Sequence, residues 1–337
     1  MSATAPSVVV QPSSVALHHH VLRASRFIGL RLAGLIGTLF LASIVVFGAL
    51  YAAPGSPLGF LTHGRSMPPE AIAQLKHEYH LDQSVFVQYF DWLGGMLHGD
   101  LGRSIVYQAP VSGLIGPRIA TTVYLIVFSM LMIVVIGLLI GIFAGLRPGM
   151  VAESLMLVST AAMAVPAFVA AVVLTLVFAV SLHWLPVFGA GGGFWDRLDH
   201  LVLPAVALML ASVAYVARLT RAAVAEELAA DHVQTAISRG LPWMFIVRRH
   251  VLRNASIQVL TVAGLTVAGL IAGSVVVEQV YQLNGLGSFL VSSVQQKDFP
   301  VVQAICMIYV AGFIVLNTLI DIAYSFLDPR ISMGGGR

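Results

Sequence analysis

Six runs of mostly apolar residues, separated by polar intervals, set the pattern of this chain. The runs are residues 32–53, 119–146, 154–182, 201–217, 255–277 and 301–327. A run of about 20 apolar residues is enough for an α-helix to cross about 30 Å of hydrocarbon. The pattern therefore predicts an all-α, polytopic membrane protein with six transmembrane helices, the fourth of them short.

The first run follows a basic segment, which a cleaved signal peptide would also show. Arg23, Arg26 and Arg31 precede the run. The run is longer than the usual apolar region of a signal peptide, and no clear small-residue cleavage pattern precedes Pro54. We therefore expect a retained first helix over residues 27–53, after an N-terminal tail over residues 1–26.

The polar interval over residues 54–117 is too charged to cross a membrane, so we expect a long loop between the first two helices. Its Pro-Pro-Glu start predicts an amphipathic helix over Pro69–His80, because proline and an acidic residue suit a helix N-terminus. The many glycines farther on predict a bent, compact loop over Trp92–Gly102. His77 and His80 are three residues apart, whereas a zinc-protease box needs a spacing of four, so we interpret this segment as a solvated face.

Small residues recur at a spacing of four inside two of the runs. The second run holds Gly137, Gly141 and Gly145, and the fifth holds Gly269 and Gly273. In a membrane such ridges allow helix backbones to approach one another closely. We therefore expect close helix packing here rather than a ligand site.

A basic stretch over residues 218–254 lies between the fourth and fifth runs and carries six of the eighteen Lys and Arg residues. Asp231 and Gln234 form a capping-box-like start, since the carboxylate can accept free backbone N–H groups while the glutamine reaches back. Gly240 can adopt the left-handed conformation that ends a helix. The stretch predicts a short helix over His232–Arg239, with Ala236 and Gly240 as small residues on a face that another element could approach.

Composition and charge support a membrane location and give an orientation. The chain is 58% hydrophobic and 10% charged, with a mean hydropathy of +0.91 and a pI near 9.2. Its basic residues cluster at the ends of apolar runs, which indicates membrane orientation rather than nucleic-acid binding. Outside the long loop and Arg118 at its end, twelve Lys and Arg residues lie on the side of the termini and the basic stretch, against Arg197 and Lys297 on the other. The positive-inside rule therefore places both termini and the basic stretch in the cytoplasm.

Candidate chemistry in the sequence is sparse. The single cysteine, Cys306, excludes an intrachain disulfide, and the adjacent His18, His19 and His20 have no fixed geometry for a metal. We find neither a Gly-x-Ser-x-Gly motif nor a properly spaced His-Glu-His set, which argues against an intramembrane hydrolase. An ion-driven secondary transporter remains an alternative, although it would usually show acidic residues deep in its spans.

Several motifs in order resemble those of one family. Residues 230–241 resemble the coupling segment of ABC importer permeases, in which a Glu-Ala-Ala triplet is followed after three residues by glycine. Gln234, Thr235, Ala236 and Gly240 occupy those positions, with Gln and Thr replacing the first two triplet residues. The other matching segments are Trp92–Gly95, Gly99–Ser104, Pro110–Val111, His250–Asn254, Val275–Val280, Gly285–Gly287, Asp298–Pro300 and Leu327–Arg330. Together they are similar to the first permease of dipeptide and oligopeptide importers, over nearly the whole chain after residue 25.

This resemblance implies a fold, a function and partners. It implies the transmembrane domain of a type I ABC importer, with a core over residues 118–330, a coupling segment over residues 218–254 and a C-terminal tail over residues 331–337. The chain would pair with a homologous permease in the bacterial inner membrane and receive substrate from an extracytoplasmic binding protein. Nickel, glutathione and haem importers share this permease type.

The resemblance also implies that this chain is not itself an enzyme and carries no cofactor. It contains no Gly-x-x-x-x-Gly-Lys-Ser/Thr phosphate loop, and its only lysines are Lys76 and Lys297. ATP and magnesium would be bound by two partner ATPase subunits. The residues expected to contact those subunits are Asp231, Gln234, Thr235, Ala236, Arg239, Gly240 and Leu241.

Four further residues are candidates for the translocation path or its gate. Pro166 interrupts the third run, where it frees a backbone carbonyl and bends the helix. Glu278 ends the fifth run, and Gly285 and Gly287 follow in the next loop. Asp321 is interpreted as structural, because an ionisable residue near the end of a span can snorkel or pair.

Overall fold

A computed structural model describes residues 33–49, 68–70, 72–73 and 82–327, with side chains omitted for 253–265 and 320–327. The described chain is helical apart from short connections and one isolated bridge between Arg103 and Pro110. After the helix Ala33–Ala49, its elements are α4 (Val85–Leu97), α5 (Val111–Leu146), α6 (Met150–Met163), α7 (Ala167–Leu174), α8 (Phe194–Leu210), α9 (Val213–Ala229), α10 (Asp231–Ser238), α11 (Trp243–Ile246), α12 (Leu252–Val280), α13 (Leu286–Gln295) and α14 (Phe299–Leu327).

Two of the described helices, α5 and the Phe299–Leu319 part of α14, are long and apolar enough to cross a membrane as single helices. Two bent pairs raise this number to four: α6 with the α7 segment, and α8 with α9. The helix Ala33–Ala49 and the described end of α12 are shorter apolar segments. The all-helical membrane fold is therefore confirmed, whereas the count of six spans stays a prediction.

The second helix begins earlier than the charge pattern predicted. The loop was expected to reach residue 117, but α5 begins at Val111 and includes both Pro117 and Arg118. Pro110, with a φ of −57°, precedes its first turn. At about 1.5 Å per residue, the 36 residues of α5 span about 54 Å, far more than the hydrocarbon thickness. The first charged residue before an apolar run therefore does not mark the start of this helix.

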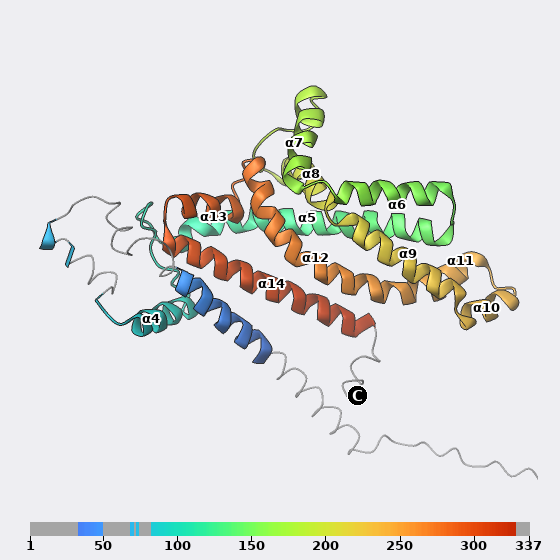
Figure 1. Ribbon diagram of the computed structural model, residues 1–337, viewed down its shortest axis with the longest axis horizontal. Helices are drawn as coiled ribbons and strands as arrows, with labels where there is room; N and C mark the ends of the chain where they lie inside the picture. Colours follow the sequence, from blue (N-terminus) through green and yellow to red (C-terminus); the bar gives the residue numbers. More distant parts are fainter. Residues whose placement is uncertain (1–32, 50–67, 71, 74–81, 328–337) are drawn as a thin grey trace, which may run out of the picture.

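Pro166 breaks the third span, as predicted. It lies between α6 and α7 as the N-cap of α7, and the axes of the two segments differ by 103°. The chain continues beyond α7 as a π-helical turn over Thr175–Ser181. In Figure 1 α6 runs alongside α5, whereas α7 points away from the bundle.

The glycine ridge of α5 lies directly against α9. A Cβ added to Gly137 would lie 2.7 Å from a methyl carbon of Val216, and one added to Gly145 would lie 2.7 Å from a methyl carbon of Val224. A Cβ on Gly141 would lie 2.6 Å from the carbonyl oxygen of Ala217. These separations are too short for any side chain, so the predicted close packing is confirmed. The partner residues on α9 also recur at one-turn spacing.

In the second predicted glycine pair, only one of the two glycines lies at a close helix contact. A Cβ on Gly273 would lie 2.9 Å from Leu208 of α8, but one on Gly269 would meet nothing within 4 Å. Gly273 therefore lies at a close helix contact inside the chain, whereas Gly269 faces open space.

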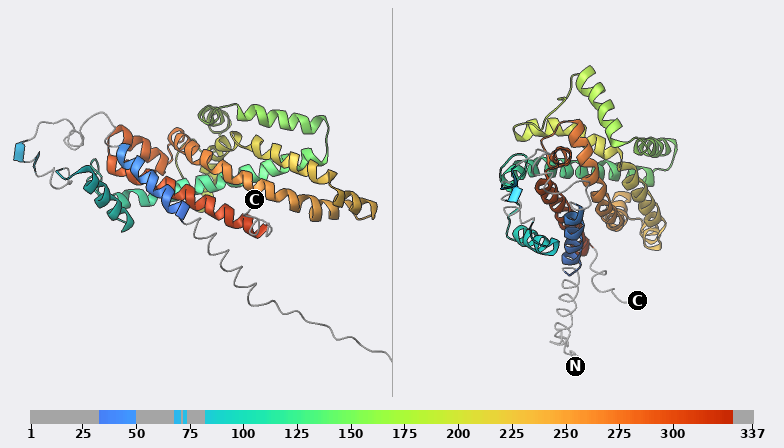
Figure 2. Two further views of the ribbon diagram at one scale, coloured as in Figure 1. Left: turned by 60° about the horizontal axis from the view of Figure 1, so that its bottom comes forward. Right: turned by 60° about the vertical axis from the view of Figure 1, so that its left-hand side comes forward.

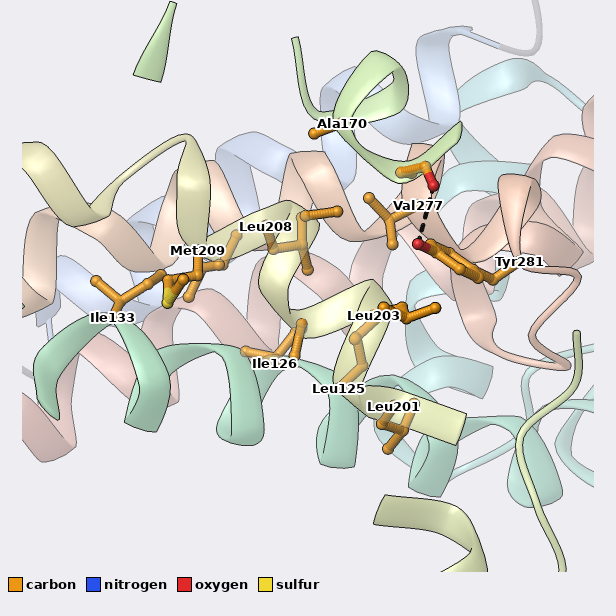
Figure 3. Packing of buried hydrophobic residues seen from close by; sticks show 14 of the residues in the cluster. Leu125, Ile126, Ile133, Ala170, Leu201, Leu203, Leu208, Met209, Val277 and Tyr281 are labelled. Carbon is orange, nitrogen blue, oxygen red and sulfur yellow. Dashed lines mark hydrogen bonds between the residues drawn. The ribbon is translucent and has the colours of Figure 1, made fainter. Parts of the chain in front are cut away.

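The main apolar core lies where α5, α8 and α12 cross (Figure 3). Leu125 of α5, Leu203 of α8 and Val277 of α12 are almost completely buried there. Tyr281, just after α12, is also buried, and its hydroxyl donates a hydrogen bond of 3.0 Å to the carbonyl of Ala171 in α7. This bond holds the broken third span against the end of α12.

Two helices were missed in the polar intervals. Trp92–Gly95 was predicted to lie in a compact loop but belongs to α4, and only the following Gly99 and Gly102 have positive φ. Tyr89 holds α4 against the helix Ala33–Ala49, since its ring packs on Phe47 at 5.4 Å between centroids and its hydroxyl hydrogen bonds to Ser43 at 2.7 Å. The loop after α12 likewise contains α13.

The predicted helix over Pro69–His80 is described only in part. Residues 69–70 and 72–73 are helical, and the rest of this prediction lies outside the described residues.

Figure 2 shows that the helix Ala33–Ala49 lies beside α14 and α4 in both views.

The α5–α9 contact provides a direct test of the packing. Replacing Gly141 by alanine should destabilise the protein by about 1–3 kcal/mol, the usual cost of overpacking a close contact. The measurement is the thermal unfolding temperature of the purified protein in detergent. Gly113→Ala in the same helix is the matched control, because an added Cβ there meets nothing within 4 Å. Equal unfolding temperatures for the two variants would contradict the described contact.

Candidate functional site

The predicted bend after the short helix is formed as a Schellman motif. α10 covers Asp231–Ser238, close to the predicted His232–Arg239. Gly240 has a φ of +71°, and its N–H donates to the carbonyl of Ile237 at 2.9 Å. The N–H of Leu241 donates to the carbonyl of Ala236 at 3.3 Å. These two bonds satisfy the carbonyl groups at the helix end, as the sequence predicted for a glycine at this position.

The predicted start of the same helix is wrong in detail. Ala230, rather than Asp231, is the N-cap, and no side chain caps the free N–H groups. Gln234 does not reach back to the N-cap N–H group, because its side-chain amide donates to the carbonyl of Leu228 at 2.9 Å. Gln234 therefore ties α10 to the end of α9 instead of closing a capping box.

The two small residues of α10 have different surroundings. Ala236 is 5% exposed and packs with Val233, Val224 of α9 and Ile246 of α11. Gly240 is exposed, and a Cβ on it would meet nothing within 4 Å. Ala236 therefore packs α10 against α9 and α11 of the same chain. Of the two small residues, only Gly240 lies on a surface that another protein could approach.

The described surface around this bend is apolar and basic. Trp243, Met244 and Phe245 of the α11 region are about half exposed, and Arg248 and Arg249 line a small cavity of about 300 Å³ beside them. In Figure 1 α10 and α11 lie together at one end of the molecule, and α4 and α13 lie toward the opposite end. The exposed residues at the α10 end thus form a projecting surface.

At the opposite end, Glu278 forms a buried hydrogen-bonded centre. Its side chain is 0% exposed. One carboxylate oxygen accepts the hydroxyl of Thr122 in α5 at 2.6 Å, and the other accepts the N–H groups of Gly287 at 2.7 Å and Ser288 at 3.1 Å. The Thr122 oxygen in turn accepts the N–H of Leu286 at 2.8 Å. The first three N–H groups of α13 therefore all bond to Glu278 or Thr122, and a carboxylate at a helix N-terminus is electrostatically favourable.

Gly285 and Gly287 are required by this arrangement. A Cβ on Gly285 would lie 2.6 Å from the carboxyl carbon of Glu278, and one on Gly287 would lie 2.6 Å from the Cα of Val275. The structure thus brings together three of the four path candidates. Pro166 takes no part in this network, since it is the exposed N-cap of α7.

A second buried carboxylate, Asp298, was not predicted as a site residue. It is 0% exposed and precedes α14. It accepts hydrogen bonds from the Ser104 hydroxyl and from the N–H of Ile105 at 3.1 Å. The only sequence signal for it was the Asp-x-Pro segment within the family resemblance. Asp298 connects the segment before α5 to the last span.

The described residues contain no group of three His, Cys, Asp or Glu side chains that could hold a metal ion. The buried carboxylates instead bond to hydroxyl and backbone N–H groups, which fixes the helix connections at one end of the bundle. Hydrogen bonds thus hold the helices together at the α13 end, and the exposed residues of α10 and α11 form a surface for contacts at the opposite end.

Comparison with known proteins identifies the family. A model described as "Binding-protein-dependent transport system inner membrane component" matches residues 137–333, and the N-terminal model of the same system matches residues 24–126. This chain belongs to that family of ABC importer permeases.

Two permeases named for glutathione transport agree with the family assignment. The glutathione transport system permease protein GsiC of Escherichia coli O6:H1 is 36% identical over 302 residues, which cover 89% of this chain and 97% of the relative. GsiC of Salmonella typhimurium is 35% identical over the same shares. A solved structure of the inward-facing MetNI methionine ABC transporter covers 66% of this chain and 97% of its own, at 19% identity and a TM-score of 0.48.

The buried Glu278 of this permease can be tested by removing its acceptor oxygens. Glu278→Ala would leave the Thr122 hydroxyl and two N–H groups of α13 without partners, at about 1–3 kcal/mol for each buried donor. We expect the free energy of unfolding to fall by at least about 2 kcal/mol, measured by thermal or denaturant unfolding in detergent.

Glu226→Ala is the control for this experiment, because Glu226 is an exposed carboxylate on α9. Its effect should stay within about 0.5 kcal/mol, as for most surface substitutions. If both variants unfolded alike, the hydrogen bonds of Glu278 would not hold α13 in place.

Proposed function

We propose that this permease pairs with a second, homologous permease to form the path by which small peptides enter a bacterial cell. An extracytoplasmic binding protein delivers the peptide, and two ATPase subunits, which bind ATP and magnesium, supply the energy. The observation that carries this proposal is the 36% identity across 89% of the chain to permeases named for glutathione transport. Glutathione is itself a small peptide, so dipeptides, oligopeptides and glutathione form one candidate class.

The geometry of α10 supports a role in contacting the ATPase subunits. The residues proposed for this role are Asp231, Gln234, Thr235, Ala236, Arg239, Gly240 and Leu241. Of these, Ala236 is buried and packs α10 against α9 and α11. The others lie on the exposed side of α10 and its bend. A helix fixed at its inner face and free at its outer face can pass a partner's displacement to the spans.

The charge distribution supports an orientation with α10 in the cytoplasm and α13 outside. Arg239, Arg248 and Arg249 lie at the α10 end, as the positive-inside rule requires of the cytoplasmic side. A cysteine placed at the exposed Ser238, in a Cys306→Ser background, should react with an impermeant thiol reagent only from the cytoplasmic face. Labelling from outside alone would reverse this orientation.

Reconstitution tests the function directly. Both permeases and both ATPase subunits, placed in liposomes with the binding protein, should accumulate a labelled dipeptide, trialanine or glutathione only when ATP is present on the ATPase side. Nickel and haem are assayed in parallel, because importers of both share this permease type. Accumulation driven by an ion gradient without ATPase subunits would support the secondary-transporter alternative and contradict the proposal.

Gly240 tests the coupling role. Its positive φ adds a backbone cost of roughly 1 kcal/mol for any residue with a Cβ. Gly240→Ala and Gly240→Leu share that cost, and the Cβ of either residue would meet no described atom within 4 Å. Gly240→Ala should therefore reduce ATP-driven uptake mildly, and Gly240→Leu should abolish it through a clash with the ATPase.

Uptake and ATP hydrolysis are measured for both variants at matched expression. Arg248→Ala is the control, since it removes one of several exposed charges near the bend and should change uptake little. Normal uptake by Gly240→Leu would show that this bend does not transmit the motion of the partner.

A further inference from the structure

A cavity of about 310 Å³ opens beside the Glu278 network, at the end of the molecule opposite α10. It is lined by Tyr107 before α5, Arg118 of α5, the connection after α12, and Ser288, Phe289 and Ser292 of α13. Its volume lies at the lower end of the range for small-molecule sites. The cavity is therefore large enough for one end of a short peptide.

Among the described residues, Arg118 is the only charged one that lines this cavity. Its guanidinium lies 4.2 Å from the centre of the Phe289 ring, and one terminal nitrogen donates to the carbonyl of Leu114. Its Nε has no hydrogen-bond partner, and no carboxylate among the described residues lies within salt-bridge distance of it. The guanidinium is thus held in place by the protein, and the described part of the chain offers it no anionic partner.

Three amide side chains face the same cavity. Gln279, Gln282 and Asn284 are exposed, and none of them forms a side-chain hydrogen bond with another described residue. Gln282 also has a positive φ of 49°, which is uncommon for a residue other than glycine. Primary amides both donate and accept, so together they can pair with the N–H and C=O groups of a peptide backbone.

The position of Arg118 allows access from water. α5 is about 24 Å longer than the hydrocarbon of a membrane, and Arg118 lies in its third turn. Tyr107, at the cavity rim, is 46% exposed and packs on Phe289 at 5.9 Å between ring centroids. An incoming molecule would therefore meet the exposed ring of Tyr107 in the same cavity as the guanidinium.

We propose that this cavity binds the free carboxylate end of a peptide, with Arg118 pairing with the carboxylate and the three amides holding the adjoining peptide groups. A guanidinium is suited to carboxylates because its planar N–H groups can bond to both oxygens. This proposal rests on the proposed function and adds the part of the substrate that the permease recognises. A docked carboxylate of the binding protein is the competing occupant, which is less favoured because the three amides match a peptide backbone.

The test measures peptide binding to the assembled permease–ATPase complex in lipid nanodiscs, without the binding protein. The probes are trialanine and trialanine amide, which differ only at the C-terminal carboxylate. Arg118→Gln should weaken trialanine binding about 10- to 100-fold, the usual effect of losing hydrogen bonds to a charged group. Binding of trialanine amide should be weaker than that of trialanine in the wild type and unchanged in the variant.

Arg197→Gln is the matched control. Arg197 also lies over an aromatic ring, at 5.0 Å from Tyr124, and its Nε also has no partner, but it does not line the cavity. This variant should bind trialanine as the wild type does. Arg118→Lys should recover part of the affinity, because it restores the charge without the planar pair of donors.

Three results would overturn the inference. They are no measurable trialanine binding by the wild-type complex, equal loss of both peptides in Arg118→Gln, and loss of binding-protein affinity while trialanine binding stays unchanged. The last result would assign the cavity to docking. Uptake of small peptides such as trialanine by the wild-type complex with its binding protein is measured separately. The proposed function fails only if no small peptide is taken up, so its failure can be told apart from failure of this inference.

Discussion

The close approach of the α5 and α9 backbones is the contact on which the arrangement of the bundle depends. Lipid tails are as apolar as leucine, so burial of apolar surface gives helices little reason to associate within a membrane. Dispersion contacts between closely packed backbones take over that role. Gly137, Gly141 and Gly145 leave no space between the two helices. Because α9 leads directly to α10, this contact also fixes the position from which the chain enters α10.

Hydrogen bonds to two buried carboxylates organise the other end. Glu278 joins α12 to α5 and to the first turn of α13, and Asp298 joins the start of α14 to the segment before α5. Because both carboxylates are fully buried, each donor in these networks needs a protein partner. The connections between helices at this end are therefore as well specified as the helices themselves. Near them, the guanidinium of Arg118 bonds to the carbonyl of Leu114, and its Nε has no hydrogen-bond partner among the described residues.

Sequence patterns predicted the features that depend on local chemistry. Apolar runs gave the membrane class, Pro166 gave the break, and Gly240 gave the helix end, because each effect needs only nearby residues. The start of α10 was wrong because Gln234 bonds to Leu228 rather than to the N-cap. α4 and α13 were missed because contacts with distant residues, such as Ser43 and Thr122, stabilise them. The partners of Glu278 lie far away in the chain, so spacing alone could not assign them.

The bond between Ser104 and Asp298 has a consequence for the order in which the protein is made. The two residues are 194 positions apart, and Asp298 lies at the start of the last span. The ribosome therefore completes most of the chain before the turn that begins at Ser104 can find its acceptor. Until then the N–H of Ile105 depends on water or a substitute partner. The native contact between the segment before α5 and the last span can thus form only after Asp298 has been synthesised.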